Sequence, residues 1–263
     1  MKKCRITALA ACVILAAAVS DARAEGDYVR AAPALVQQVD GPPVTLQAKE
    51  ARDLPRVFCP QGQTSTGGGI RLNPNNGVFL NASNPGGPGW DISVDNQSDE
   101  PRTVTPLVIC AADPSITHRV GTTANGPTAE SAATCPAGQF VAGGGAAAKA
   151  KNYLSLSVSD ANHWFGRAKN VNTIFTGVVA FARCSNRPHS AANGDAVTLQ
   201  PGQTGTSQAQ CPSGQVPTAG GGSGDPNVLH NASAPTATGW SLRATNTDNI
   251  PRLVVAHVVC TAP

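Results

Sequence analysis

The chain has 263 residues, a formal net charge of +3 and only 13% charged side chains. Segment 1–24 carries four basic residues and one acidic residue, so the rest of the chain has 15 of each and no net charge. A basic surface for nucleic acid or anionic lipid is therefore excluded. Glycine (27) and proline (21) are abundant and helix formers such as Glu, Lys and Met are scarce, which favours short strands joined by turns.

Residues 1–24 have the pattern of a secretory signal peptide. A basic start is followed by an apolar run, residues 6–19, and by the small-x-small cleavage site Ala22-Arg23-Ala24. We expect cleavage after Ala24 and a secreted or periplasmic protein. A rival interpretation, a lipoprotein acylated at Cys12, leaves too short an apolar region before the cut. No later stretch approaches the roughly 18 apolar residues that a membrane-spanning helix needs, so we expect no membrane span.

The motif Cys-Pro-x-Gly-Gln occurs three times, and its copies start 76 residues apart. Each is followed by three glycines, a Trp, an Asn six residues after the Trp and a second Cys twenty residues after the Trp. Such self-similarity indicates a repeat architecture. We divide the chain into signal peptide 1–24 and modules 25–112, 113–186 and 187–263, called copies 1, 2 and 3. Their landmarks are Cys59, 67–69, Trp90, Asn96 and Cys110; Cys135, 143–145, Trp164, Asn170 and Cys184; and Cys211, 220–222, Trp240, Asn246 and Cys260.

This set of landmarks resembles repeats in secreted bacterial proteins, and the resemblance covers nearly the whole mature chain. No function is attached to the resemblance, so it implies no site residues.

The six cysteines of the mature chain allow 15 pairings. The repeat selects one bridge per copy: Cys59–Cys110, Cys135–Cys184 and Cys211–Cys260. An exported protein meets the oxidising compartment in which such bridges persist. Each closes a loop of about 50 residues, worth roughly 4 kcal/mol in the chain-entropy model. Zinc binding does not fit, because these cysteines lack a close Cys or His neighbour.

Alternation of side chains places the landmarks on faces of strands. After each Trp the same-face residues are apolar or Gly, as with Ile92 and Val94, so we predict that the Trp is buried rather than a sugar-stacking platform. The Asn that follows suits a turn. The glycine triplets lack the Lys-Ser/Thr and helix of a phosphate loop, and we predict a bulge or close backbone approach there.

The segment before each second Cys also alternates, which predicts a half-buried strand. Pro106 cannot donate a ladder hydrogen bond, so this strand is expected at an edge or with a bulge in copy 1. Upstream of the first Cys, Val44 and Val197 occupy similar places, and we expect Val120 to be the middle equivalent.

No pattern of residues points to catalysis. The five histidines form no close cluster, and the chain has neither His-Glu-x-x-His nor Gly-x-Ser-x-Gly. The acidic spread from Asp91 to Glu100, with Asp95 and Asp99, is absent from copies 2 and 3 and indicates a solvated face rather than a cation site. We expect no catalytic residue, no cofactor and no metal. A deep pocket lined by His and carboxylates from different copies would instead favour the hypothesis of an enzyme.

We therefore predict an all-β fold of three tandem disulfide-closed antiparallel modules, each a small sandwich or barrel-like unit of five or so strands. The modules are arranged either as beads or around a pseudo-threefold axis. For function we expect a non-catalytic binding or adhesion protein whose partner is a glycan or cell-envelope component, because three weak sites give avidity. The alternative is a structural envelope protein with no small ligand. The candidate ligand-binding residues, shared by copies 1 and 3, are Asn81, Arg102, Asn231 and Arg252.

Overall fold

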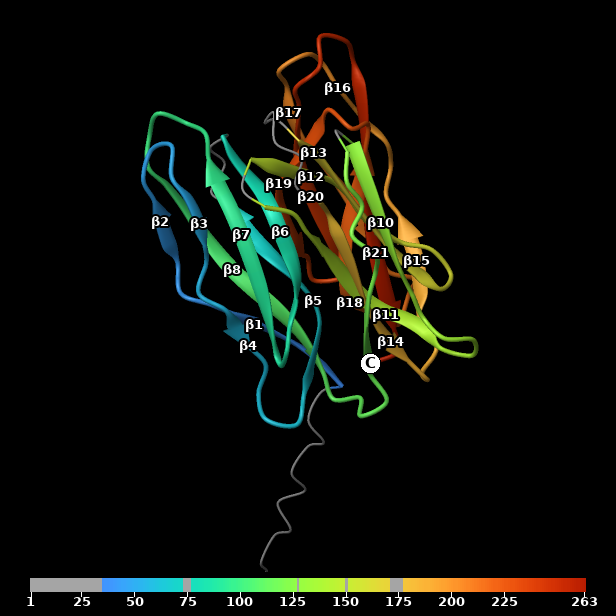
Figure 1. Cartoon of the computed structure of the whole chain (residues 1–263). Helices are drawn as coiled ribbons and strands as arrows, with labels where there is room; N and C mark the ends of the chain where they lie inside the picture. Colours follow the sequence, from blue (N-terminus) through green and yellow to red (C-terminus); the bar gives the residue numbers. More distant parts are fainter. Residues whose placement is uncertain (1–34, 73–76, 127, 150, 171–176) are drawn as a thin grey trace, which may run out of the picture. The chain divides into compact units, whose positions relative to one another are not determined.

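The computed structural model describes residues 35–72, 77–126, 128–149, 151–170 and 177–263. The predicted signal peptide lies outside these residues. Every regular element in them is a β-strand, which confirms the all-β prediction (Figure 1).

The described residues form 21 strands, distributed unequally among the copies. Copies 1, 2 and 3 contain eight, six and seven of them, more than the expected five or so. The number is higher because some long strands pair with two short strands in place of one, as β8 pairs with β1 and β2. Copy 1 contains β1 (Val36–Asp40), β2 (Val44–Leu46), β3 (Ala51–Asp53), β4 (Val57–Phe58), β5 (Thr64–Leu72), β6 (Val78–Gly86), β7 (Gly89–Asn96) and β8 (Arg102–Ala111). Copy 2 contains β9 (Thr117–Val120), β10 (Thr128–Thr134), β11 (Phe140–Ala147), β12 (Asn152–Ser159), β13 (His163–Asn170) and β14 (Val179–Ser185). Copy 3 contains β15 (Ser190–Asn193), β16 (Val197–Leu199), β17 (Thr204–Gln210), β18 (Val216–Gly224), β19 (Val228–Pro235), β20 (Gly239–Asn246) and β21 (Arg252–Thr261).

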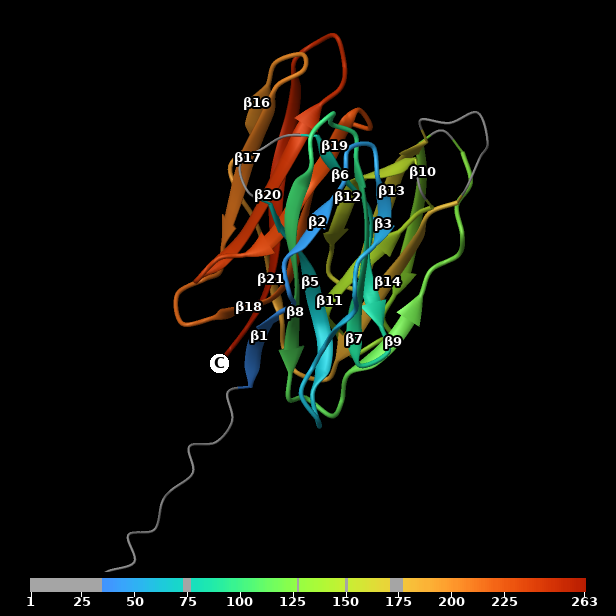
Figure 2. The same cartoon turned by 90° about the vertical axis from the view of Figure 1, so that its left-hand side faces the viewer.

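Each of the three antiparallel sheets is built from two different copies (Figures 1 and 2). Copies 1 and 3 form the order β1-β8-β5-β19-β20-β17, copies 1 and 2 form β3-β7-β6-β11-β14-β9, and copies 2 and 3 form β10-β13-β12-β18-β21-β15. The short strands β2, β4 and β16 pair beside these paths, with β8, β7 and β21. Because every copy gives strands to two sheets, the copies close into a cycle and are not separate beads.

The glycine strands β5, β11 and β18 meet where the copies join. A Cβ on Gly68, Gly144 or Gly220 would lie 2.3–2.5 Å from the Trp ring of its own copy. A Cβ on the next glycine (Gly69, Gly145 or Gly221) would lie 2.0–2.1 Å from a serine carbonyl oxygen in the neighbouring copy. Each strand also has a register shift just before these glycines. Both the predicted bulge and the predicted close approach are therefore confirmed, with Ala219 in copy 3 filling the place that Gly67 and Gly143 fill elsewhere.

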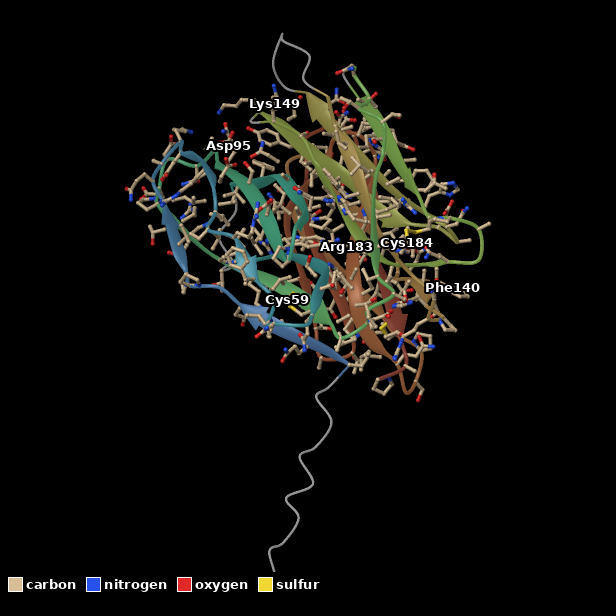
Figure 3. All side chains as sticks on the ribbon, turned by 60° about the horizontal axis from the view of Figure 1, so that its bottom comes forward. Cys59, Asp95, Phe140, Lys149, Arg183 and Cys184 are labelled. Atoms are coloured by element: carbon tan, nitrogen blue, oxygen red, sulfur yellow. A yellow bond between two sulfur atoms is a disulfide. The ribbon has the colours of Figure 1, made fainter. Side chains whose placement is uncertain are left out.

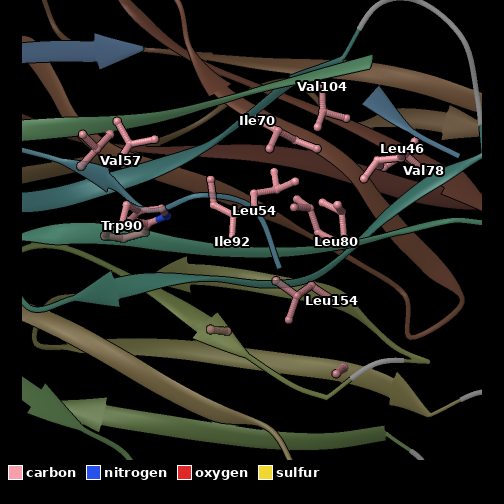
Figure 4. Close-up of a cluster of buried hydrophobic side chains, with 14 of the residues drawn as sticks. Leu46, Leu54, Val57, Ile70, Val78, Leu80, Trp90, Ile92, Val104 and Leu154 are labelled. Atoms are coloured by element: carbon pink, nitrogen blue, oxygen red, sulfur yellow. The ribbon is translucent and has the colours of Figure 1, made fainter. Parts of the chain in front are cut away.

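The three tryptophans are buried, as predicted. Trp90, Trp164 and Trp240 are at most 1% exposed. Each indole Nε1 donates a hydrogen bond to a buried serine Oγ seven residues earlier, at 2.9, 3.1 and 2.8 Å. Around Trp90 pack side chains from several strands, and the cluster extends to Leu154 of copy 2 (Figure 4).

The three predicted disulfides are present: Cys59–Cys110, Cys135–Cys184 and Cys211–Cys260. Each second cysteine lies on the last strand of its copy (β8, β14 or β21) and is fully buried. The bridge therefore fastens that strand within its own copy, although the sheet that contains it continues into a neighbour.

Polar contacts also cross between copies. The buried Arg183 on β14 of copy 2 donates to Ser65 Oγ (3.1 Å) and to the carbonyl of Gly87 (2.7 Å), both in copy 1 (Figure 3). Burial lowers the pKa of Arg183 to about 10. At the ends of β6, β12 and β19, one side chain from each copy joins an apolar cluster: Phe79, Tyr153 and Leu229.

The first alternative for Pro106, an edge strand, is wrong, because β8 is an interior strand between β1 and β5. Pro106 lies opposite the break between β1 and β2, where its carbonyl accepts from Gly41 N at 2.8 Å. In copies 2 and 3 the equivalent N–H groups, of Ala180 and Ala256, donate to Ser131 and Ser207 Oγ. Copy 1 has Leu54 at the place of these serines. The missing donor is thus matched by a missing acceptor.

Val120 is not the middle equivalent of Val44 and Val197. Those two residues pair with Val104 and Val254, whereas Val120 pairs with Phe181. The equivalent in copy 2 is Ala124, which pairs with Val178. The equivalence could not be recognised in the sequence because copy 2 has an alanine where copies 1 and 3 have a valine.

Candidate functional site

A groove of about 620 Å³ lies on the face of the β3-β7-β6-β11 sheet that points away from Trp90. This volume is within the range of ordinary ligand sites. We call it the copy 1–2 groove, because β3, β6 and β7 belong to copy 1 and β11 leads into its copy 2 wall. It is lined by Ala51, Arg52, Asp53, Leu54, Arg56, Ala82, Asn84, Asp91, Ile92, Ser93, Ala148 and Lys149.

A bidentate ion pair between Arg56 and Asp91 forms part of the lining of the groove. Arg56 Nε and Nη2 donate to Asp91 Oδ1 and Oδ2 at 2.5 and 2.8 Å. The hydrogen bond and the charge of Asp91 raise the pKa of Arg56. A Cβ on Gly86 would lie 2.2 Å from the Asp91 carboxylate, and one on Gly89 would lie 2.9 Å from the Arg56 side chain. The glycine-rich turn between β6 and β7 therefore makes the room that this pair occupies.

The other polar groups of the groove mix donors and acceptors. Asn84 is 9% exposed and projects beside Asp91, its cross-strand partner. Arg52 and Lys149 add positive charge and Asp53 adds negative charge, so the lining has three basic and two acidic side chains. Arg52 is paired loosely with Glu50 at 3.6 Å. Such a lining fits an uncharged polar ligand better than a strong ion of either sign.

The equivalent positions of the other two sheets have different chemistry. Strand registers place Phe165 and Ser241 at the position of Asp91, and Val158 and Ala234 at that of Asn84. The sheet of copies 1 and 3 keeps a smaller groove, about 330 Å³. The copies thus share a scaffold but not a triplicated site, and the expected repetition of exposed site residues is not found here.

Asn81 and Asn231 are fully buried. Each lies at a register shift, where Asn81 Nδ2 donates to the carbonyl of Asn152 (3.1 Å) and Asn231 Nδ2 to that of Val78 (2.6 Å). Both bonds join two copies. A ligand in solution does not reach these side chains, so neither Asn81 nor Asn231 is a candidate for ligand binding.

Arg102 and Arg252 are half-buried on β8 and β21, in two different sheets. Arg252 binds Asp248 Oδ2 through Nε (2.8 Å) and Nη2 (2.6 Å), and lies 3.5 Å from Asp225. Hydrogen bonds from Asn227 and Arg252 lower the pKa of Asp248 to about 2. Neither arginine lines the copy 1–2 groove, so the four sequence candidates do not form one site.

The acidic spread of copy 1 is only partly a solvated face. Asp95 is fully buried and accepts from Tyr153 (3.0 Å), with Lys151 Nζ at 3.2 Å (Figure 3). Burial and the nearby carboxylate raise the pKa of Tyr153. Asp99 is exposed and pairs with Lys49 at 2.9 Å. The interpretation is therefore wrong for Asp95, which joins copy 1 to copy 2.

The predicted turn asparagines are confirmed where the side chains are described. Asn96 Nδ2 donates to the carbonyls of Gln47 and Glu100, and Asn246 Nδ2 to those of Leu199 and Ile250. The side chain of Asn170 lies outside the described set.

Sequence reasoning missed Arg56 and Asn84 and treated Asp91 as a surface acid. The available signal was the turn 85–89, where copy 1 alone has Gly at 86 and 87.

No protein-family model matches the chain, and no curated protein matches it either. Within the described ranges, no group of three or more His, Cys, Asp or Glu side chains is arranged to hold a metal ion. A helix able to cross a membrane is likewise not found in the part of the chain that the structure describes. The three disulfides indicate an oxidising environment, extracellular or periplasmic.

Proposed function

We propose that the chain is an exported binding protein whose ligand site is the copy 1–2 groove, and that this groove binds its ligand without catalysis. The observation that carries this proposal is the fixed Arg56–Asp91 pair inside a groove of about 620 Å³. Neither equivalent position has such a pair, so the fold does not require it. The predicted signal peptide and the three disulfides support export.

The ligand that fits best is hydroxyl-rich, such as an envelope carbohydrate. A carboxylate accepts two O–H groups, a guanidinium donates several hydrogen bonds, and an amide does both. Asp91, Arg56 and Asn84 therefore offer complementary partners for neighbouring hydroxyls. Their mutual pairing keeps local charge low, which disfavours a strongly charged ligand.

The test is a glycan array and a cell-wall pulldown, followed by calorimetric titration of any glycan that binds. Asp91→Ala removes the carboxylate and frees Arg56, and we expect binding to weaken at least tenfold. Ser241→Ala changes the equivalent position of the smaller groove and is the matched control, expected to bind as the native chain does. Equal binding by both variants would place the site elsewhere.

The second candidate is a structural envelope protein with no small ligand. It is favoured by the burial of every tryptophan and of Tyr153, which leaves no Trp or Tyr platform among the described residues. An array without signal, obtained with protein whose tryptophan fluorescence shows a native core, would support this candidate over the first.

A further inference from the structure

A further cavity, about 180 Å³, lies where copy 2 meets copy 3. The end of β12 and the turn after it supply Ser159, Asp160 and Ala161, and the start of β15 supplies the facing wall. The complete lining is Val141, Ser159, Asp160, Ala161, His189, Ser190, Ala191 and Val259. It therefore brings a serine, a carboxylate and a histidine from different copies to one place.

Ser159 is the first member of a chain of hydrogen-bonded side chains that come from three strands. Ser159 Oγ, at the end of β12, is 2.8 Å from His257 Nε2 on β21. His257 Nδ1 is 2.8 Å from Asn193 Oδ1 on β15. The order of groups is hydroxyl, imidazole and amide oxygen, which is the arrangement of a nucleophile, its base and the group that orients the base.

The backbone fixes which imidazole nitrogen carries the proton. Ser159 N–H also donates to His257 Nε2, at 3.2 Å, so Nε2 must be an acceptor. The ring proton is then on Nδ1 and is donated to Asn193 Oδ1. Nε2 has one lone pair, so the Ser159 hydroxyl shares this acceptor with the backbone N–H and is the nearer of the two donors, at 2.8 Å against 3.2 Å. This is the tautomer that can remove a proton from the serine.

The fold does not require these three polar residues. Strand registers place Pro85 and Pro235 at the position of Ser159, and Leu107 and Phe181 at that of His257. The position of Asn193 is filled by Asp40 and Val120. The hydrogen-bonded set thus exists at one junction of the cycle, in place of mostly apolar residues.

The imidazole is held in a dry setting. His257 is 4% exposed and meets the edge of the Trp164 ring, with centroids 6.5 Å apart. Burial lowers the pKa of His257 to about 4, so the ring is neutral at neutral pH. Asp160, on the cavity wall, is paired with His163 at 2.9 Å.

We propose that Ser159 is a nucleophile that takes an acetyl-sized acyl group from an ester, with His257 as its base and Asn193 as a positioning residue. In this step the Ser159 Oγ–carbon bond forms and the carbon–alkoxide bond of the ester breaks. The hydroxyl proton passes to His257 Nε2 and leaves on the alcohol. Water, activated by the same base, would release the acid. The cavity, about 180 Å³, has room for a small acyl group such as acetyl. This reactivity goes beyond the proposed binding function and uses other residues.

The experiment treats the full chain with p-nitrophenyl acetate and follows p-nitrophenol release, while peptide mapping locates the acetyl group. We expect the adduct on Ser159 in folded protein and its loss in Ser159→Ala. His257→Leu, the residue of copy 1, should slow acylation at least a hundredfold. Ser241→Ala, which changes a serine on β20 in another sheet, should leave the rate unchanged.

Asn193 is tested by rescue. Asn193→Ala should slow acylation of Ser159, and Asn193→Asp, the residue of copy 1, should restore it, because a carboxylate also accepts from Nδ1. Thermal melts of each variant verify the fold. Acetylation spread over many serines, or an adduct on Ser159 whose rate is the same in His257→Leu, would overturn the proposal.

Discussion

Replacing His230 by leucine should remove a specific part of the protein's acid sensitivity. His230 on β19 is 1% exposed, and Leu80 and Leu154 occupy its position in the other copies. Burial, helped by the charge of Arg167, lowers the pKa of His230 from 6.5 to about 3. The leucine therefore suits the site in shape and carries no titrating group.

The sign and size follow from proton linkage. A histidine whose pKa is lower in the folded chain stabilises that chain fully above the unfolded pKa, and the contribution falls as pH drops below it. At about pH 5 the unfolded ring is protonated and the folded ring is not. The 1.5-unit gap below 6.5 is then worth about 2 kcal/mol of unfolding free energy. The pKa of His257, lowered to about 4, adds a similar loss.

The assay is urea unfolding followed by tryptophan fluorescence at about pH 7.5 and about pH 5. We expect His230→Leu to lose about 2 kcal/mol less than the native chain between these two conditions, because all other titrating groups are shared. Ser241→Ala should show the native pH dependence. If His230→Leu lost as much stability as the native chain, the assignment of a buried neutral imidazole would be refuted.

Three further outcomes test the architecture. Gly69→Ala should destabilise by more than about 3 kcal/mol in urea melts, because its Cβ would lie 2.0 Å from the Ser233 carbonyl; Gly62→Ala, which has open space but φ of +81°, should cost only about 1 kcal/mol. Ser83→Ala leaves Trp90 Nε1 without its acceptor and should cost about 1–3 kcal/mol by the same melts, whereas a cost near zero would contradict the buried bond. Replacing both Cys135 and Cys184 by alanine should lower stability by about 2–5 kcal/mol and keep one calorimetric transition, because sheets run between copies; two separated transitions would argue for independent modules.

The repeat made much of the fold predictable. Period-two alternation placed Trp90, Trp164 and Trp240 on the inner face, and equal spacing selected one bridge per copy. Both signals are local or periodic, and both are confirmed. The sharing of sheets was not predictable, because the strands of neighbouring copies meet through only a few pairs, such as Ser83 with Ala146. No sequence pattern marks those contacts.

The sites were harder to predict for a related reason. Arg56, in the connection between β3 and β4, and Asp91 on β7 are 35 residues apart, and of these two segments only the strand that contains Trp90 could be given a face from the sequence. Ser159 and His257 are 98 residues apart and belong to different copies. Residues that differ among copies mark both places, so comparing copies in register finds what looking for identical residues overlooks.

The cyclic sharing of sheets has a consequence for how the chain is made. Thr66 Oγ1 donates to the carbonyl of Thr218, 152 residues later in the sequence. The chain is synthesised from its N-terminus, so β5 has an unpaired backbone edge until β19 has been made. Unpaired strand edges can form hydrogen bonds with other chains. A product that stops before copy 3 would keep that edge permanently. Synthesis of copy 3 is thus the step that pairs the open edge of β5 and completes the sheet of copies 1 and 3. Truncated products should therefore aggregate rather than persist as smaller folded proteins.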